Sequence, residues 1–204
     1  MCIRDRNLGS SVFEESFAKG KNDKDTIKFT ATIDKNTLNL TSTLKNGTQY
    51  SRKITLDESG NILCQSIVKN KTDSTRTYQL ITDPIFDTRK RARDAELIKG
   101  FVKYKGKLTQ FNKGLIFNHG PQEHLFKDAV DGGEVIFFNA ESNFGLKEKY
   151  DSKQIEILNA SWRDSGSLMS IGLKTKEFTL KPGETYTFNY KFEYLDKLPV
   201  ETKK

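Results

Sequence analysis

The chain has 204 residues and a mass of 23.3 kDa, and 34 Lys and Arg against 27 Asp and Glu give it a formal net charge of +7. This length suits a single domain, and no apolar run is long enough to form a transmembrane helix. No nucleic-acid-binding motif accompanies the positive charge, so we expect no nucleic-acid partner. We expect the positive net charge to favour solubility and to attract acidic polymers weakly.

The N-terminal hexapeptide MCIRDR resembles the translation of a sequencing adapter, a contaminant of metagenomic genes. If the native N-terminus is missing, any leader or preceding domain is missing with it. We therefore expect an artefactual or disordered segment, one β-sandwich domain and a polar tail, at residues 1–25, 26–197 and 198–204.

Cysteine usage does not fix the cellular compartment. Cys2 belongs to the suspect hexapeptide, which leaves Cys64 alone on the apolar face of a predicted strand. A single cysteine cannot form an intrachain disulfide, so we expect Cys64 to be a small buried apolar side chain. The periplasm, the extracellular space and the cytoplasm all remain open.

From Thr26 onward, short segments of alternating polarity are separated by turn residues such as Asn46-Gly47, a pattern typical of antiparallel sheets. Asp87–Gly100 breaks the pattern, and either a short helix ending at Gly100 or a long loop would fit it. Its cluster of Arg89, Lys90, Arg91 and Arg93 would either capture an acidic polysaccharide or form a solvated face. We expect strands near residues 27–33, 38–44, 50–56, 62–70, 75–84, 101–104, 114–119, 134–139, 144–150, 154–161 and 168–174.

The last strand is the clearest prediction. Lys181-Pro182-Gly183-Glu184 predicts a tight turn, because proline presets φ and glycine supplies a positive φ. After this turn, aromatic residues occupy every second position from Tyr186 to Tyr194. A period of two places the aromatic rings on one buried face, so we expect a long strand that closes a large antiparallel sheet.

Three groups of motifs stand out between about residues 60 and 195. They are Val68-Lys69-Asn70-Lys71-Thr72 leading into Thr82–Phe86, then Phe137–Tyr150, and finally Trp162, Ile171-Gly172-Leu173 and Leu180-Lys181-Pro182-Gly183-Glu184. Together they resemble the galactose mutarotase-like superfamily, which includes the aldose 1-epimerases. The resemblance implies an all-β, antiparallel β-supersandwich.

The chain departs from this superfamily at two positions. The resemblance implies a His before the first proline and a Glu in the closing segment, of which one acts as sugar ligand or acid and the other as base at the anomeric hydroxyl. Asp83 stands where the His is expected, and Lys174 stands where the Glu is expected. We therefore expect a carbohydrate-binding domain without the usual epimerase residues, although Asp83 and Lys174 could form a new acid/base pair or an ion pair.

Two further groups are candidates for ligand contacts. His119 and His124 flank a Gly-Pro loop with Glu123 between them, but a loop without other ligands predicts an ordinary polar loop rather than a metal site. Trp162 could stack on a sugar ring while Arg163 hydrogen-bonds its hydroxyls, or it could be a core residue beside an outward-pointing arginine. We expect neither metal nor cofactor, since no such motif appears.

Three functions follow from these residues. The leading one is carbohydrate recognition by a monomer, through Asp83, His119, His124, Trp162 and Arg163. The second is a sugar epimerase or polysaccharide-active enzyme with an altered site, for which the catalytic candidates are His124, Asp83 and Lys174. The third is a structural or assembly β-domain of a cell-envelope protein.

Overall fold

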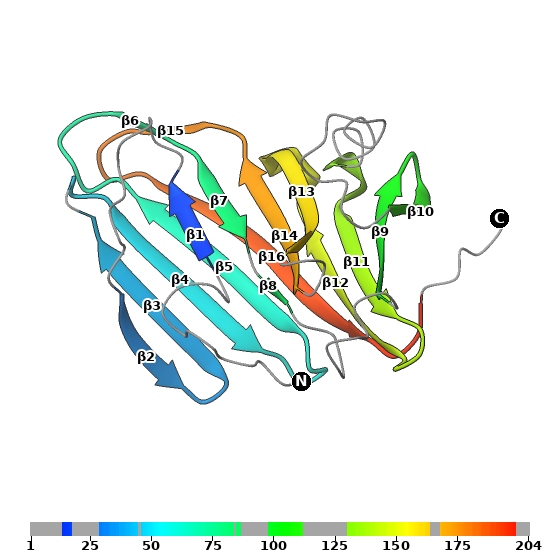
Figure 1. Ribbon diagram of the computed structural model, residues 1–204. Coiled ribbons are helices and arrows are strands. Elements are labelled where there is room, and N and C mark those ends of the chain that lie inside the picture. The colour runs from blue at the N-terminus through cyan, green and yellow to red at the C-terminus, as the bar shows by residue number, and fades with distance from the viewer. Residues whose placement is uncertain are drawn as a thin grey trace.

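The computed structural model describes residues 14–17, 29–44, 46–83, 85–86, 98–111, 130–163 and 168–198. These residues form strands and short 3-10 turns, and they include no helix long and apolar enough to cross a membrane. Two large antiparallel sheets lie one over the other, with a small two-stranded sheet at one end (Figure 1). The all-β sandwich predicted from the sequence is confirmed.

The larger layer is a nine-stranded antiparallel sheet with the order β10-β9-β11-β12-β16-β5-β4-β3-β2. Most of its hairpins lie where the sequence predicts them, and β11 and β12 have the predicted bounds. The strands are β2 (Thr30–Asp34), β3 (Thr37–Thr43), β4 (Gln49–Leu56), β5 (Ile62–Lys69), β9 (Ile98–Tyr104), β10 (Lys107–Phe111), β11 (Glu134–Asn139), β12 (Phe144–Tyr150) and β16 (Thr185–Leu195).

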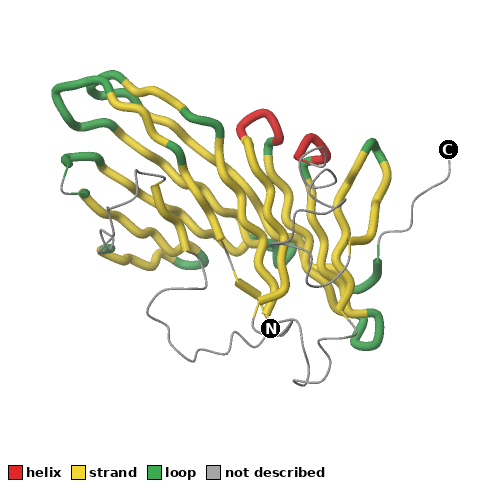
Figure 2. The backbone as a smooth tube through the Cα atoms, turned by 45° about the horizontal axis from the view of Figure 1, so that its top comes forward, coloured by secondary structure: helices red, strands yellow, loops and turns green. Residues whose placement is uncertain are grey.

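The smaller layer is a five-stranded sheet in which β1, β7, β14 and β13 follow one another and β8 also pairs with β14. The 3-10 turns η2 (Val130–Gly132) and η3 (Ser152–Gln154) lie side by side (Figure 2). The strands of the five-stranded sheet are β1 (Glu14–Phe17), β7 (Leu80–Asp83), β8 (Ile85–Phe86), β13 (Ile155–Arg163) and β14 (Leu168–Thr175), and those of the two-stranded sheet are β6 (Arg76–Tyr78) and β15 (Phe178–Leu180).

The C-terminal strand β16 has the predicted period of two but not the predicted place. It lies in the middle of the nine-stranded sheet, between β12 and β5, rather than closing an edge. Its rings at Phe188, Tyr190 and Phe192 are buried as expected, whereas Tyr194 is 54% exposed. The strand continues past the core at this end, and the Tyr194 ring packs against Phe144 with ring centroids 5.4 Å apart.

Gly100 does not end a helix, because it lies inside β9 and pairs with Phe111 of β10 and Phe137 of β11. A Cβ atom at this glycine would lie 2.3 Å from Cζ of Phe111, which is too close. The Phe111 ring therefore packs directly on the backbone of Gly100, and any other residue there would clash with it. Strand pairing therefore explains this glycine, while residues 87–97 lie outside the described part of the chain.

The predicted strand at residues 75–84 is two strands, β6 and β7, in different sheets. The pairing partner of the chain changes at Gln79, because β6 pairs with β15 whereas β7 pairs with β14. Just after this break, the backbone amide of Leu80 donates to Oγ1 of Thr175 at 3.0 Å. The short strands β10 and β15 were not predicted, and the predicted strand at residues 114–119 lies outside the described residues.

The main hydrophobic core fills the space between the two large sheets. Alternating side chains of β4, β5, β12 and β16 meet those of β7, β13 and β14 there. Cys64 is 2% exposed in this core, as expected of a small buried apolar side chain. Other fully buried members are Tyr50, Val68, Leu80, Ile171, Leu173 and Phe188.

Two of the sequence motifs meet at Asn70, which has no exposed surface. Its side-chain amide donates to the carbonyls of Ser74 at 2.8 Å and Leu180 at 2.9 Å, while its side-chain oxygen accepts from the amide of Thr72 at 3.0 Å. Its backbone amide donates to the carbonyl of Glu184 at 3.0 Å, and its carbonyl accepts from Gly183 at 2.7 Å. The backbone of Asn70 thus joins the end of β5 to the turn that begins β16, and its side chain joins the same point to the end of β15.

We expect Asn70→Ala to lower the free energy of unfolding by about 2 to 4 kcal/mol, because it removes the donor to the buried carbonyl of Leu180 and the acceptor for the Thr72 amide. Urea denaturation monitored by fluorescence measures the change. Asn189→Ala is the matched control, since Asn189 is exposed and bonds only the exposed side chain of Gln65 among the described contacts. We expect this control to change stability by less than about 0.5 kcal/mol; equal losses in both variants would contradict a special role for Asn70.

Candidate functional site

Four of the predicted site residues lie on strands of the five-stranded sheet. Asp83 ends β7, Lys174 lies near the end of β14, and Trp162 and Arg163 end β13. His119 and His124 lie outside the described residues. The sheet therefore places Asp83 and Lys174, the two positions at which the sequence analysis expects a departure from the epimerase residues, on neighbouring strands.

Strand register shows how far apart these positions are. Lys174 pairs with Ile81 of β7, two residues before Asp83. Trp162 pairs with Met169, and Met169 pairs with Phe86 of β8. Five residues separate Met169 from Lys174, which is about 17 Å along an extended strand. The tryptophan therefore lies toward the opposite end of the strand from Lys174, and the candidate positions are spread along the sheet instead of converging.

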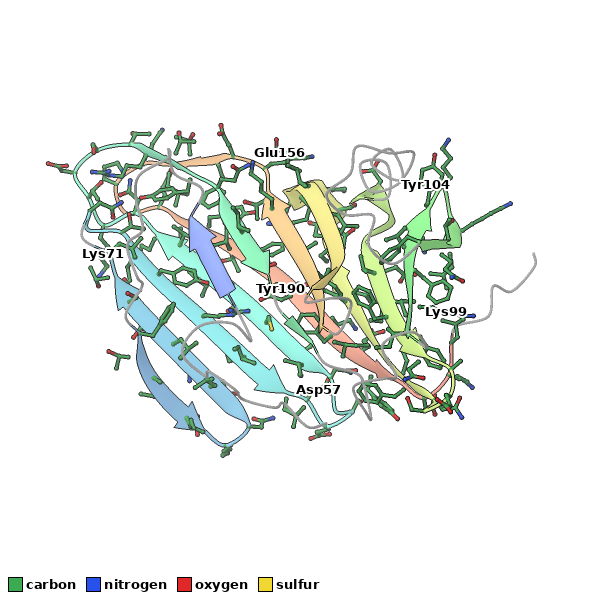
Figure 3. All side chains as sticks on the ribbon, viewed as in Figure 1. Asp57, Lys71, Lys99, Tyr104, Glu156 and Tyr190 are labelled. Carbon is green, nitrogen blue, oxygen red and sulfur yellow. The ribbon has the colours of Figure 1, made fainter. Side chains whose placement is uncertain are left out.

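A β-bulge brings an additional carboxylate to Lys174. Ile155 pairs with Thr175 and Ile157 pairs with Lys174, so Glu156 is the extra residue of β13 between these two pairs. Such a bulge redirects a side chain. The Glu156 carboxylate lies 3.8 Å from the Lys174 ammonium nitrogen and is about half exposed. It lies where β13 and β14 come together at one end of the sheet (Figure 3).

Gln79 completes this group. Its side-chain amide donates both to the Glu156 carboxylate and, at 2.9 Å, to the carbonyl of Thr175. Gln79 is 7% exposed and comes from the break between β6 and β7. We call Gln79, Glu156 and Lys174 the polar triad. It combines an acceptor, a cationic donor and an amide at the rim of the sheet.

Sequence reasoning missed Glu156 and Gln79. A signal for the bulge was present, because Ile157 and Leu158 are adjacent apolar residues in a strand that otherwise alternates. The structure buries Ile155 and Leu158 and leaves Ile157 46% exposed, which is the pattern of one inserted residue. Gln79 gave no comparable signal, since its role depends on a change of sheet partner.

A second group of charged residues, Arg52 and Glu148, is buried in the core, and the ring of Tyr190 that Arg52 contacts lies near the centre of the view in Figure 3. Arg52 is 3% exposed, donates to the hydroxyl of Tyr190 and lies 5.8 Å from the centre of its ring. Glu148 is fully buried, and neither carboxylate oxygen has a hydrogen-bond partner among the described residues. Burial raises the pKa of Glu148 well above its usual value, and the charge of Arg52 offsets this only in part.

The opposite face of the sheet holds a second, partly buried glutamate, Glu193 on β16. Its carboxylate lies 2.6 Å from Lys147, 3.0 Å from Lys149 and 2.6 Å from Lys191. Although burial opposes ionisation, the hydrogen bonds from these lysines lower the pKa of Glu193 to about 2. One strand pair therefore carries two glutamates whose pKa values are shifted in opposite directions.

No protein-family model and no curated protein sequence matches the chain. Among solved structures, a galactose mutarotase-like protein from Lactobacillus casei is similar with a TM-score of 0.64 and 12% identity, over 89% of this chain and 84% of that one. A galactose mutarotase related enzyme from Lactobacillus acidophilus has a TM-score of 0.59 and 12% identity, over 84% and 73%. An aldose epimerase homologue from C. elegans has a TM-score of 0.54 and 9% identity, over 82% and 68%.

At such identities the likeness concerns the fold. The all-β sandwich and these matches support a galactose mutarotase-like fold, of which the chain is a divergent member, as its motifs predict.

The buried Glu148 predicts an unusual dependence of stability on pH. Because the pKa of Glu148 is higher in the folded chain, the folded state keeps a proton that the unfolded chain releases. The contribution of Glu148 to folding stability is therefore fully present below the unfolded pKa of 4.5 and is lost as pH rises toward the folded pKa. We expect the free energy of unfolding of Glu148→Gln, relative to that of the native chain, to increase as pH rises, by up to about 1.4 kcal/mol per pH unit. Urea denaturation at pH values from 5 to 9, in roughly unit steps, measures the difference.

Glu193→Gln is the control with the opposite sign. The lowered pKa of Glu193 stabilises the native chain above the unfolded value of 4.5, and this contribution is lost as pH falls toward about 2. The native chain should therefore be the more stable of this pair at neutral pH. A constant difference between native chain and Glu148→Gln across the pH series would show that Glu148 titrates normally.

Proposed function

We propose that this protein binds a carbohydrate on the face of the five-stranded sheet that carries the polar triad, and that it does not interconvert anomers. The observation that carries the proposal is the triad itself, which contains Lys174 at the position where the sequence resemblance implies a Glu. The binding residues would be Glu156 and Lys174 together with Gln79.

The fold supports a carbohydrate-related role by analogy. The similar solved structures include a galactose mutarotase-like protein and a galactose mutarotase related enzyme. One fold can host several functions, so the argument for this chain must come from its own residues.

The chemistry of the triad suits sugar hydroxyls. A carboxylate accepts hydrogen bonds from two neighbouring hydroxyls, an ammonium donates to a hydroxyl or ring oxygen, and an amide supports either role. Because Glu156 and Lys174 lie 3.8 Å apart and have opposite charges, the triad is close to neutral overall. A neutral, strongly hydrogen-bonding surface favours a neutral sugar over a charged one.

The same residues argue against anomer interconversion. That reaction needs an acid and a base on opposite sides of the ring oxygen and C1. In this chain the motif positions for the pair are occupied by Asp83 and Lys174, and the Lys174 ammonium faces the carboxylate of Glu156. We infer that the site orients a sugar without supplying the matched acid and base.

One alternative has a specific observation in its favour. Glu156 and Lys174 are themselves a carboxylate and an amine in close contact, and such a pair can transfer protons. An epimerase with an altered site would then use Glu156 as base and Lys174 as acid. This alternative differs from the binding proposal in one measurable property, the rate at which a pure anomer equilibrates.

Binding should appear as thermal stabilisation. A ligand that binds only the folded chain raises its stability by about 2.7 kcal/mol at one hundred times the dissociation constant. We expect a neutral mono- or oligosaccharide at millimolar concentration to raise the melting temperature of the native chain. Lys174→Ala and Glu156→Gln should each abolish this rise, and Trp162→Ala tests whether the other end of the sheet contributes.

Lys176→Ala is the matched control, because Lys176 is an exposed lysine just beyond the end of β14. It should retain the full shift. No shift with any sugar, in protein that melts cooperatively, would rule out the binding proposal. Polarimetry of freshly dissolved α-galactose or α-glucose separates the alternatives, since acceleration that is lost in Glu156→Gln would identify an epimerase.

A further inference from the structure

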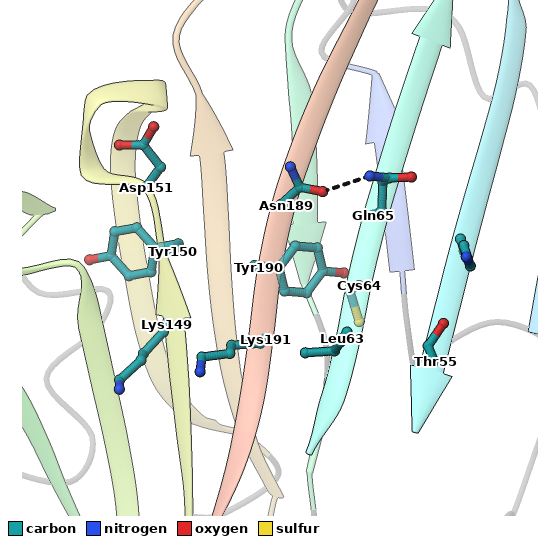
Figure 4. A pocket seen from close by; sticks show the side chains of 11 residues that line it. Thr55, Leu63, Cys64, Gln65, Lys149, Tyr150, Asp151, Asn189, Tyr190 and Lys191 are labelled. Atoms are coloured by element: carbon teal, nitrogen blue, oxygen red, sulfur yellow. Dashed lines mark hydrogen bonds between the residues drawn. The ribbon is translucent and has the colours of Figure 1, made fainter. Parts of the chain in front are cut away.

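The outer face of the nine-stranded sheet contains a second candidate site, a shallow hollow of about 470 Å³ formed by β4, β5, β12 and β16 (Figure 4). This face points away from the five-stranded sheet, because alternate residues of the same strands, such as Cys64 and Tyr190, fill the core between the sheets. The hollow is therefore separate from the polar triad.

Strand register arranges the hollow as two rows of side chains. In one row Lys149 pairs with Lys191, which pairs with Leu63, and Leu63 pairs with Thr55. In the second row Asn189 pairs with Gln65, which pairs with Lys53. The Gln65 amide donates to the Asn189 side-chain oxygen at 3.0 Å, so these two amides form a joined polar floor (Figure 4).

Positive charge lies on both sides of this floor. Lys149 and Lys191 lie on one side, and Lys53 lies on the other, two strands or about 10 Å away from Lys191. Asp151 is the acidic residue among those that line the hollow, which leaves a net charge of +2. Glu193 holds Lys149 and Lys191 beside the hollow, with Lys147 adding a compensating charge next to it.

This combination fits a ligand that carries anionic groups on a hydroxyl-rich framework. The lysines match carboxylate or sulfate groups that are spaced along a chain, and the amides with the Thr55 hydroxyl offer both donors and acceptors to hydroxyls. The exposed side of Leu63 offers an apolar patch of the kind that a sugar ring can cover. The volume suits a few sugar rings rather than a folded protein.

The hollow is poorly suited to nucleic acid. Single strands are held by bases stacked on aromatic side chains, but the two aromatic residues that line the hollow, Tyr150 and Tyr190, are buried on the core side. The major groove of duplex DNA admits a helix or a two-stranded ribbon, whereas this surface is a broad sheet.

We propose that the hollow between Lys53 and the Lys149–Lys191 pair binds an acidic saccharide, one whose rings carry carboxylates or sulfates. This site goes beyond the proposed function, since it lies on another sheet and takes a charged ligand where the polar triad takes a neutral one. A protein with both sites would contact two different parts of a mixed polysaccharide, or two chains at once.

Titration calorimetry with a hexasaccharide of galacturonic acid tests the proposal, with a neutral hexasaccharide of glucose as comparison. We expect the charged ligand to bind and the neutral one to bind far more weakly at this site, with an affinity that falls as salt rises. Lys53→Gln combined with Lys191→Gln should weaken binding at least about tenfold. Lys53→Gln alone, which leaves the Glu193 contacts intact, should show an intermediate loss.

Lys176→Gln combined with Lys181→Gln removes the same charge from exposed positions outside the hollow and should change the affinity less than about twofold. Equal weakening by both double variants, or no binding by the native chain, would overturn the proposal, as would tighter binding of an oligothymidylate of equal charge. Lys174→Ala should leave this binding unchanged, so the two sites fail or succeed separately.

Discussion

The structure depends first on the buried amide of Asn70. Through it the end of β5, the loop before β6, the end of β15 and the turn that begins β16 share one set of hydrogen bonds. Because a buried polar group without partners is costly, this set leaves little freedom in how these four segments meet. The junction fixes where β16 begins, and the register of β16 against β5 places the aromatic rings in the core and the lysines outside. Both candidate sites then take their positions from the two sheets.

Local patterns in the sequence predict the elements of the larger sheet well. Alternation and turn chemistry give β11 and β12 their bounds, and they identify the Pro182-Gly183 turn, where Gly183 has a φ of +84°. What they do not give is the order of the strands. Gly100 was compatible with a helix end because the actual reason for a glycine, close contact with the ring of Phe111 on the neighbouring strand, cannot be read from the residues around it. The break at Gln79 likewise follows from a change of partner strand, which is a property of the assembled sheets.

The candidate sites show the same division between local and long-range information. Superfamily resemblance identified Asp83 and Lys174, and the structure places their positions on neighbouring strands. It could not identify Glu156, which reaches Lys174 only through a bulge whose trace in the sequence is the adjacent pair Ile157-Leu158. Side chains two positions apart on a strand lie on the same face, so Arg52 shares the buried face of Tyr50 and Glu148 shares that of Tyr150. Both charged residues are therefore buried, although charged side chains usually lie on the polar side of a strand. Which buried charges approach one another, however, depends on β4 and β12 being separated by β5 and β16.

The central position of β16 has a consequence for how the chain folds during synthesis. This strand follows every other strand of its sheet in the sequence, yet it joins β5 to β12. Until β16 emerges from the ribosome, the meander of β2 to β5 and the group β10-β9-β11-β12 have no strand to join them, and the edges of β5 and β12 that β16 covers are unpaired. Such edges recruit other chains, and pairings between distant segments form slowly. We therefore expect the nascent chain to expose the edges of β5 and β12 until β16 pairs with both, and to be most prone to self-association before that step.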